Sequence, residues 1–450
     1  MVEELPRYWE LWPLLRKLLI AGSWQIHILH ATLLLGTGTI APVAELLGIV
    51  SRQHYYERLA RGLALANVVI YSVGAVLAIA AVFVTLGFFP KFFTLFFLQF
   101  FWFLIGEEIT FLGQLYIVLL YYFTFPKLTG RAKPLHIVLG LTWIPMAILQ
   151  QSQIIAFQGF GLTPQPASPF FNPGFIPQVS HRFFGNFSWA GYALAAFAGI
   201  QYLRHLRRGS DQTPFWDWLG SLGVSLGVLS MTFFMALSGY SWAIGTKGAS
   251  PSAFYRMMVG PIAWMFQLQV LLIGMTLSLA GLYMWRRLAR AGKPVRWVRR
   301  FALATLVFAL LGAIPYYLGP SAERMWVSWT IPLGAMRPWK YLALAGSSLF
   351  GVATALAYLQ AAREGLDWGR GGKVAARLLI SVGLLALSMM VVMGAIRETA
   401  RVPGAIYGQM NRLDQVIPAG LAPQEDLHRP NPHPFTGPSK RPRAPEEPRR

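Results

Sequence analysis

The stretch GLALANVVIYSVGAVLAIAAVFVTLG, residues 62–87, contains no charged side chain. It is long enough to cross the hydrocarbon core of a bilayer as one helix, which takes about 20 apolar residues. Similar runs recur along the whole chain, and the ten candidate spans lie near residues 21–46, 62–87, 92–125, 135–158, 182–203, 217–245, 256–285, 301–318, 341–361 and 375–396. The sequence therefore predicts an all-α, polytopic transmembrane bundle of about ten helices.

The composition agrees with this class. Of 450 residues, 55% are hydrophobic and only 13% are charged, whereas soluble proteins carry roughly 25% charged residues. The absence of cysteine excludes disulfides, thiolate metal ligands and covalently attached haem c in this chain. A net charge of +21 is also typical of nucleic-acid-binding proteins, but the basic residues are scattered among short connections between apolar spans. We therefore expect a lipid bilayer and no nucleic acid as partner.

The basic residues also predict the topology. They concentrate in the connections after the first, third, fifth, seventh and ninth spans, for example RRLARAGKPVRWVRR at 286–300, and are sparse in the others. Because cytoplasmic loops are enriched in Lys and Arg, these odd-numbered connections are predicted to be cytoplasmic. Both termini are then expected outside.

Three regions are predicted along the chain. Residues 1–20 carry three glutamates before any apolar run and are expected to form an amphipathic helix on the membrane surface. Residues 21–408 form the transmembrane bundle. Residues 409–450 are rich in Pro and basic side chains and are expected to form an extracytoplasmic tail that is extended or ordered only by a partner.

Polar groups that could ligate a metal gather toward the outer face. His27 and His30 lie three residues apart on one face of the first span, and His181 begins the fifth. In FYRMMVG, Arg256 and Met258 begin the seventh span. Ionisable residues in a bilayer are costly and usually functional, so this clustering points to a cofactor.

A haem between helices accounts for the clustering, because a His and a Met from different helices form the axial pair of a six-coordinate iron suited to electron transfer. His181 and Met258 are the predicted pair, and Arg256 is expected to neutralise a haem propionate. Each residue alone also has a simpler interpretation, Met258 as packing and His181 as an interfacial side chain.

Four segments resemble, in the same order, motifs of subunit I of the cytochrome bd quinol oxidases. FYRMMVG (254–260) resembles the stretch whose methionine ligates the low-spin haem b, and NPGFIPQVSHRFFGNFSWAG (172–191) resembles the segment with that haem's histidine, which falls on His181. EEITFLG (107–113) resembles the acidic motif of the third helix. ETARVPGAI (398–406) resembles the signature whose glutamate ligates a high-spin haem b.

The resemblance covers roughly residues 20–410 and implies further ligands. Glu398 corresponds to the ligand of one high-spin haem b, with an interfacial salt bridge to Arg401 as the alternative. Arg401 is otherwise expected to hold a propionate. His30 corresponds to the first-helix ligand of the remaining high-spin haem, b or d, and His27 is the competing choice.

The acidic pair of the third helix, Glu107 and Glu108, is expected to transfer protons to the oxygen-reducing haems. The family motif aligns with Glu108, although Glu107 is an equally open choice, and Gln99 or Phe100 takes the other acidic position. The alternative for the pair is one structural glutamate hydrogen-bonded to a neighbouring helix. His136, on the cytoplasmic side, is interpreted as a loop-end residue.

The resemblance implies a bd-type respiratory terminal oxidase, an oxidoreductase of a prokaryotic inner membrane that reduces oxygen to water and has a second membrane subunit. The long loop that forms the family's quinol site is replaced here by GTKGASPSA, 245–253. The expected donor is therefore a cytochrome c subunit or soluble cytochrome c, which passes electrons through the low-spin haem to the high-spin haems. The alternative is a non-catalytic haem b subunit that relays electrons between a partner complex and the quinone pool.

Overall fold

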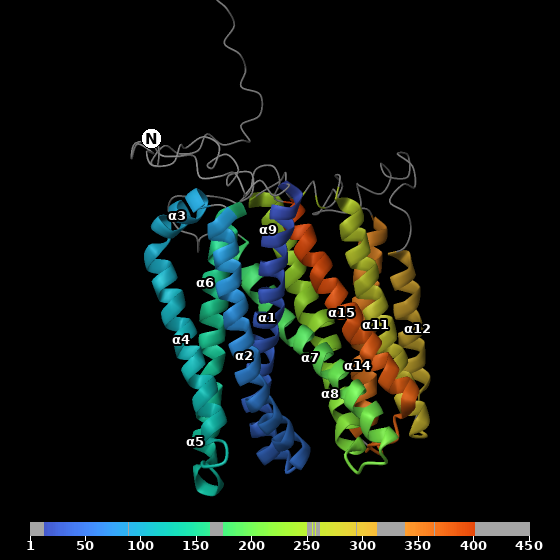
Figure 1. Ribbon diagram of the computed structural model, residues 1–450. Coiled ribbons are helices and arrows are strands. Elements are labelled where there is room, and N and C mark those ends of the chain that lie inside the picture. Colours follow the sequence, from blue (N-terminus) through green and yellow to red (C-terminus); the bar gives the residue numbers. More distant parts are fainter. Residues whose placement is uncertain are drawn as a thin grey trace, which may run out of the picture.

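The computed structural model describes residues 13–88, 90–162, 174–249, 254, 257, 262–293, 295–312, 338–363 and 365–400. Within these residues the chain is a bundle of long, roughly parallel and antiparallel helices without a β-strand (Figure 1). This confirms the predicted all-α class.

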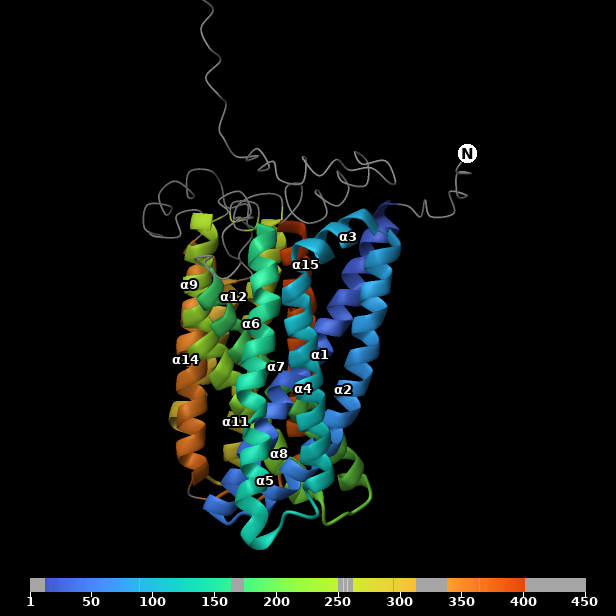
Figure 2. The same ribbon diagram turned by 90° about the vertical axis from the view of Figure 1, so that its left-hand side faces the viewer.

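The first six helices form one side of the bundle and, with α1, part of its middle. They are α1 (Pro13–Ser51), α2 (His54–Phe88), α3 (Pro90–Gln99), α4 (Phe101–Thr124), α5 (Lys133–Leu141) and α6 (Trp143–Leu162), with the short 3-10 turn η1 (Gly130–Ala132) before α5. Figure 2 shows α3 lying across the top of the bundle between α2 and α4.

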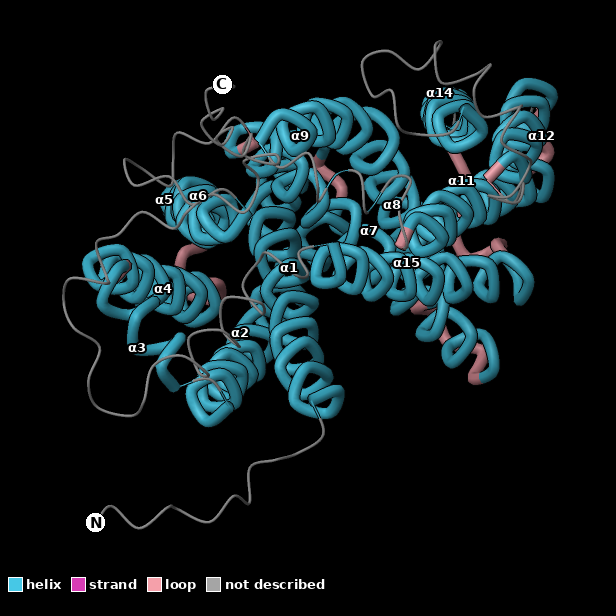
Figure 3. The backbone as a smooth tube through the Cα atoms, turned by 90° about the horizontal axis from the view of Figure 1, so that it is seen from above, coloured by secondary structure: helices cyan, strands magenta, loops and turns pink. Residues whose placement is uncertain are grey.

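The remaining helices form the centre and the other side. They are α7 (Phe175–Arg207), α8 (Thr213–Leu229), the π-helical turn η3 (Ser230–Met235), α9 (Ala236–Ala249), α11 (Ala263–Arg290), α12 (Arg296–Leu311), α14 (Pro338–Arg363) and α15 (Gly372–Ala400). Seen from above, α1, α7 and α15 lie in the middle, between the α2–α6 group and the group of α11, α12 and α14 (Figure 3).

Eight helical segments of the described chain are long and apolar enough to cross a membrane. The other two predicted spans correspond to α7 and α12, which run alongside the eight (Figure 1). Polar side chains interrupt α7, and α12 has only 16 residues. The predicted spans thus all overlap helices, three of them covering two consecutive helices (α3 and α4, α5 and α6, α8 and α9), and the chain is a multi-pass membrane protein.

The basic connections gather at one end of the bundle. The connections α1–α2, α4–α5, α7–α8, α11–α12 and α14–α15 all lie at the bottom in Figure 1. The start of α1 and the end of α15 lie together at the opposite end, where the Gln25 side chain donates to the carbonyl oxygen of Met390. We call these the basic end and the polar-ligand end. Residues 1–12 and 401–450 lie outside the described residues, so the boundaries near 20 and 408 stay predictions.

Small residues allow a close helix contact between α7 and α8. A Cβ added to Gly191 would lie 2.6 Å from the amide nitrogen of Gly227, and one added to Gly223 would lie 2.6 Å from the carbonyl oxygen of Gly191. Without a hydrophobic driving force between helices in lipid, such close backbone approach supplies much of the packing energy. The contact fixes α8, and hence η3, against α7.

Candidate functional site

The predicted site residues lie on several helices toward the polar-ligand end. The structure describes the side chains of His27 and His30 on α1, Glu107 and Glu108 on α4, and His181 on α7. Outside the described residues lie Arg256, Met258 and Arg401, together with the side chain of Glu398, whose backbone is in the last turn of α15.

His181 lies in the second turn of α7 and faces the π-helical turn η3. Its Nδ1 is 3.1 Å from the carbonyl oxygen of Met235. Because a carbonyl oxygen only accepts, Nδ1 must carry the proton, which leaves the lone pair on Nε2. Gly239 makes room for the ring, since a Cβ there would lie 3.1 Å from its Cε1 and Nδ1 atoms. Trp242 covers another side, with ring centroids 5.4 Å apart.

The local fold explains this placement. A π-helical turn widens the backbone of a helix and is frequent at functional sites. Here it ends at Met235, whose carbonyl oxygen receives the imidazole N–H. Because π-helical hydrogen bonding depends on tertiary context, the segment SMTFFM (230–235) gave no sequence signal for it.

His27 and His30 share the face of α1 that meets α2. The Nδ1 atom of His27 donates to the carbonyl oxygen of Gly74 over 3.1 Å, and that of His30 donates to the carbonyl oxygen of Ile26 over 2.9 Å. A Cβ on Gly74 would lie 3.8 Å from the Cβ of His30, so glycine allows α2 to approach both rings. The predicted common face is therefore present, and Nε2 is the lone-pair atom in both rings.

The depth of His30 relative to His181 follows from the contact between α1 and α7. A Cβ added to Gly36 of α1 would collide with the carbonyl oxygen of Asn186 of α7, so these two positions are level with each other. Both helices begin at the polar-ligand end, and His30 and His181 each lie about one and a half turns before this contact. The two histidines therefore lie at about the same depth, and the indole of Trp189 on α7 also joins the helices by donating to the carbonyl oxygen of Leu29 over 3.1 Å.

The two glutamates of α4 have different surroundings. Glu107 is half-buried and accepts a hydrogen bond from the Gln150 side chain of α6 over 3.1 Å. Glu108 is exposed on the outer surface of the bundle. The structure thus places Glu107 between helices, although the motif alignment favoured Glu108. Phe100 is buried just before α4, and the side chain of Gln99 is outside the described residues.

A buried acid–base cluster near the basic end was missed by the sequence analysis. His136 of α5 is fully buried, so its interpretation as a loop-end residue is wrong. Its Nδ1 atom lies 2.9 and 2.8 Å from the two carboxylate oxygens of Glu45, and its Nε2 atom lies 2.9 Å from the carbonyl oxygen of Tyr121. The Tyr121 hydroxyl donates to Glu45 over 2.8 Å. Both ring nitrogens face acceptors, an arrangement that suits an imidazolium paired with a carboxylate.

Further buried polar groups lie between this cluster and Glu107. The Thr37 hydroxyl donates to the Asn67 side chain over 2.6 Å, and the Tyr71 hydroxyl donates to the carbonyl oxygen of Phe111 over 2.6 Å. The side chain of Gln114 is also buried on α4, facing this interior. Polar side chains on α1, α2 and α4 therefore continue from the Glu45 cluster toward the polar-ligand end.

A second buried ion pair lies at the basic end, between α8 and α11. The guanidinium of Arg287 donates to both carboxylate oxygens of Asp217, over 3.3 and 2.9 Å, and to the carbonyl oxygen of Asp367 over 2.6 Å. The Asp217 carboxylate also accepts from the amide of Gly369 over 2.9 Å. The sequence analysis placed Arg287 in a connection, but it is fully buried in the last turn of α11. This pair fixes the α14–α15 connection.

Comparison with known proteins gives little further information on the chemistry. No protein-family model matches the chain, and no curated protein matches it. Among solved structures, the chain is similar to a bd oxidase from Geobacillus thermodenitrificans, with a TM-score of 0.48 and 15% identity over 90% of this chain and 98% of that chain. An assignment of chemistry must therefore rest on the residues.

The described residues fit haem through their imidazoles. No group of three or more His, Asp or Glu side chains converges within the described part of the chain, but haem iron takes only one or two axial side chains from facing helices. His27, His30 and His181 each have Nδ1 fixed by a backbone carbonyl. This is the outer-shell arrangement that orients a metal-binding histidine and leaves Nε2 for the metal.

Proposed function

We propose that the chain is the haem-carrying, subunit I-like component of a bd-type respiratory terminal oxidase. In this proposal it accepts electrons at the polar-ligand end, on the extracytoplasmic side of a prokaryotic inner membrane. Oxygen is the final acceptor and water the product. A second membrane subunit completes the enzyme.

One observation carries the proposal. Imidazoles on two facing helices, α1 and α7, lie in the same half of the bundle, each with Nδ1 held by a carbonyl and Nε2 left to ligate. This is the orientation that a backbone carbonyl gives to a metal-binding histidine. The order of the four sequence motifs along the chain supports the same assignment.

The chain's own residues divide the work as follows. His181 and Met258 would hold a low-spin haem b, while Glu398 and His30, or His27 in its place, would hold high-spin haems b or d. Bound haems supply one-electron carriers and the site of oxygen reduction. Arg256 and Arg401 would neutralise propionates, because a guanidinium pairs with a carboxylate through two parallel hydrogen bonds.

Protons would reach the high-spin haems through the polar interior of α1, α2 and α4. Glu107 would be the final carrier, since it is half-buried and faces α6, and Glu108 is exposed. The buried Glu45–His136 pair would be the first proton carrier from the basic end. A carboxylate and an imidazole in contact exchange protons within a hydrogen bond, which suits this role.

The donor would be a cytochrome c rather than a quinol. The short connection at 245–253 offers too little chain to enclose a quinone headgroup, and the haem c must belong to another protein because this chain has no cysteine. The tail at 409–450 would dock that donor.

Spectroscopy of the purified protein tests the proposal. Pyridine haemochrome and reduced-minus-oxidised spectra should reveal a low-spin haem b and high-spin haems that bind carbon monoxide. One low-spin haem without carbon monoxide binding would instead favour the electron-relaying subunit without oxygen chemistry. A colourless protein would refute both.

Variants assign the ligands. His181→Ala and Met258→Leu should each remove the low-spin signal while the protein still inserts into the membrane. His30→Ala should abolish carbon monoxide binding and leave the low-spin signal. His54→Ala is the matched control, because His54 is an exposed histidine at the basic end and its loss should change neither signal.

A further inference from the structure

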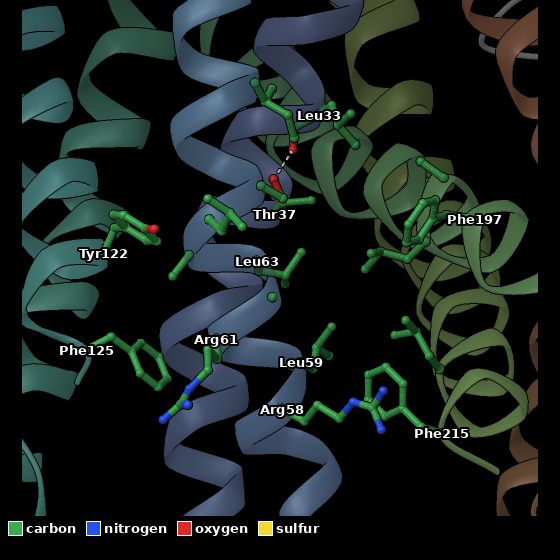
Figure 4. A pocket seen from close by; sticks show the side chains of 18 of the residues that line it. Leu33, Thr37, Arg58, Leu59, Arg61, Leu63, Tyr122, Phe125, Phe197 and Phe215 are labelled. Atoms are coloured by element: carbon green, nitrogen blue, oxygen red, sulfur yellow. Dashed lines mark hydrogen bonds between the residues drawn. The ribbon is translucent and has the colours of Figure 1, made fainter. Parts of the chain in front are cut away.

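A half-open apolar groove crosses α2 near the basic end, between α4 on one side and α7 and α8 on the other (Figure 4). Its volume is about 960 Å³, near the upper end of the roughly 300–1,000 Å³ typical of small-molecule sites. Aliphatic and aromatic side chains form most of its wall, among them Leu33, Leu59, Leu63, Tyr122 and Phe197. The groove is therefore large enough for hydrocarbon chains and too apolar for a free ion.

The lining residues do not favour haem in this groove. They include no histidine, methionine or carboxylate, and Tyr122 is the lining residue whose side chain can serve as an axial ligand to iron. The hydroxyl of Thr37 is already engaged with Asn67. The occupant must be recognised by apolar contact and by the two cations that the groove does contain.

Those cations are Arg58 and Arg61, both exposed on the first turns of α2 (Figure 4). The guanidinium carbon of Arg58 lies 4.0 Å from the ring centroid of Phe215, and its Nη2 donates to the neutral side chain of Gln212 over 3.0 Å. The guanidinium carbon of Arg61 lies 5.4 Å from the ring centroid of Phe125, at the opposite side of the groove. Aromatic rings thus hold one guanidinium at each side of the same mouth.

No described carboxylate neutralises either arginine. The nearest acidic neighbour in the sequence, Glu57, pairs instead with Lys133. Two partly free guanidiniums beside an apolar groove are complementary to a molecule with an anionic head and hydrocarbon tails. Their location at the basic end agrees with this chemistry, because cytoplasmic leaflets are rich in anionic lipids and basic pockets between helices bind their headgroups.

We propose that this groove binds an anionic glycerophospholipid, with its anionic headgroup at the mouth that Arg58 and Arg61 flank and its acyl chains along α2 and α7. The rim includes exposed apolar side chains, such as Leu65, Phe123 and Phe197, over which a lipid can enter from the bilayer. The site is independent of the proposed haem chemistry. It links α2, α4 and α8, so an occupied groove also holds the two sides of the bundle together.

Lipid retention measures the site directly. The full-length protein is reconstituted in nanodiscs of phosphatidylglycerol and phosphatidylcholine, extracted in mild detergent and analysed by native mass spectrometry for bound lipid. The wild type should retain phosphatidylglycerol in preference to phosphatidylcholine. The double variant Arg58→Gln/Arg61→Gln should retain it roughly 30-fold less, since each basic residue near a charged surface contributes about a factor of five.

Matched variants separate the groove from general charge. Arg52→Gln/Arg131→Gln removes two exposed arginines from the same end of the bundle but outside the groove, and should leave retention unchanged. Ala66→Trp fills the groove while keeping both arginines, and should displace the lipid. This second variant decides the matter if loss of the arginines impairs folding.

Three results would overturn the proposal. Equal retention of phosphatidylglycerol by the wild type and both groove variants would show that the lipid binds elsewhere. Equal retention of phosphatidylcholine would remove the role of the arginines. Recovery of a quinone, or a cross-link from Ala66→Cys to a partner subunit, would assign the groove to another occupant.

Discussion

Removal of the Asp217 carboxylate should destabilise the protein strongly, because it leaves a fully buried guanidinium without its counter-charge. In Asp217→Ala, Arg287 loses both charge-assisted hydrogen bonds and keeps only the one to the carbonyl oxygen of Asp367, and the amide of Gly369 loses its acceptor. Breaking a buried ion pair from one side costs about 3–5 kcal/mol. We expect a loss in this range in the free energy of unfolding.

Unfolding by sodium dodecyl sulfate in mixed micelles, followed by circular dichroism, measures this loss. The control is Asp367→Ala, which breaks the exposed ion pair between Asp367 and Arg370, three residues later in the chain. The loss of this pair should cost at most about 1 kcal/mol. The double variant Asp217→Leu/Arg287→Met removes both charges and should recover most of the stability. Equal effects of Asp217→Ala and Asp367→Ala, or a double variant as unstable as the sum of its parts, would refute the reasoning.

Three further predictions follow from other contacts. Gly223→Ala should cost about 1–3 kcal/mol of stability in the same assay, since its Cβ would lie 2.6 Å from a backbone oxygen of α7, whereas Gly87→Ala, with open space around it, should be nearly neutral. Glu45→Leu should cost about 1–3 kcal/mol because it strands a buried imidazole and a buried phenol, and Glu45→Gln, which keeps an acceptor, should cost less. If the chain is an oxidase, Glu107→Gln should slow oxygen consumption at an electrode far more than Glu108→Gln; the reverse order would assign the proton-carrying role to the exposed residue.

The sequence predicted the helical architecture well because a bilayer imposes strict rules. Backbone groups in lipid must be satisfied within a helix, so an apolar run such as 62–87 has almost no other structure available. The alternation of basic connections likewise predicted which ends of the helices lie together, since charge is costly to move across the membrane. The apolar run at 182–203 likewise predicted α7, although the polar side chains of this helix keep it outside the eight most apolar segments of the described chain.

The site was only partly predictable. The shared face of His27 and His30 followed from helical periodicity and is present in the structure. Spacing along one helix could not distinguish Glu107 from Glu108, because the neighbour that selects between them, Gln150, belongs to another helix. The π-helical turn opposite His181 was likewise invisible in a sequence that suits an ordinary helix.

The sequence by itself thus determined that this chain is a multi-pass helical membrane protein and which end of the bundle carries the basic residues, because these properties depend on local hydropathy and charge. Only the tertiary structure decided which polar groups meet in the interior. Glu45 and His136 are 91 residues apart, and Asp217 and Arg287 are 70 apart. Their partnership depends on which helices pack side by side, and that is set by side-chain shape and close glycine contacts across the whole bundle.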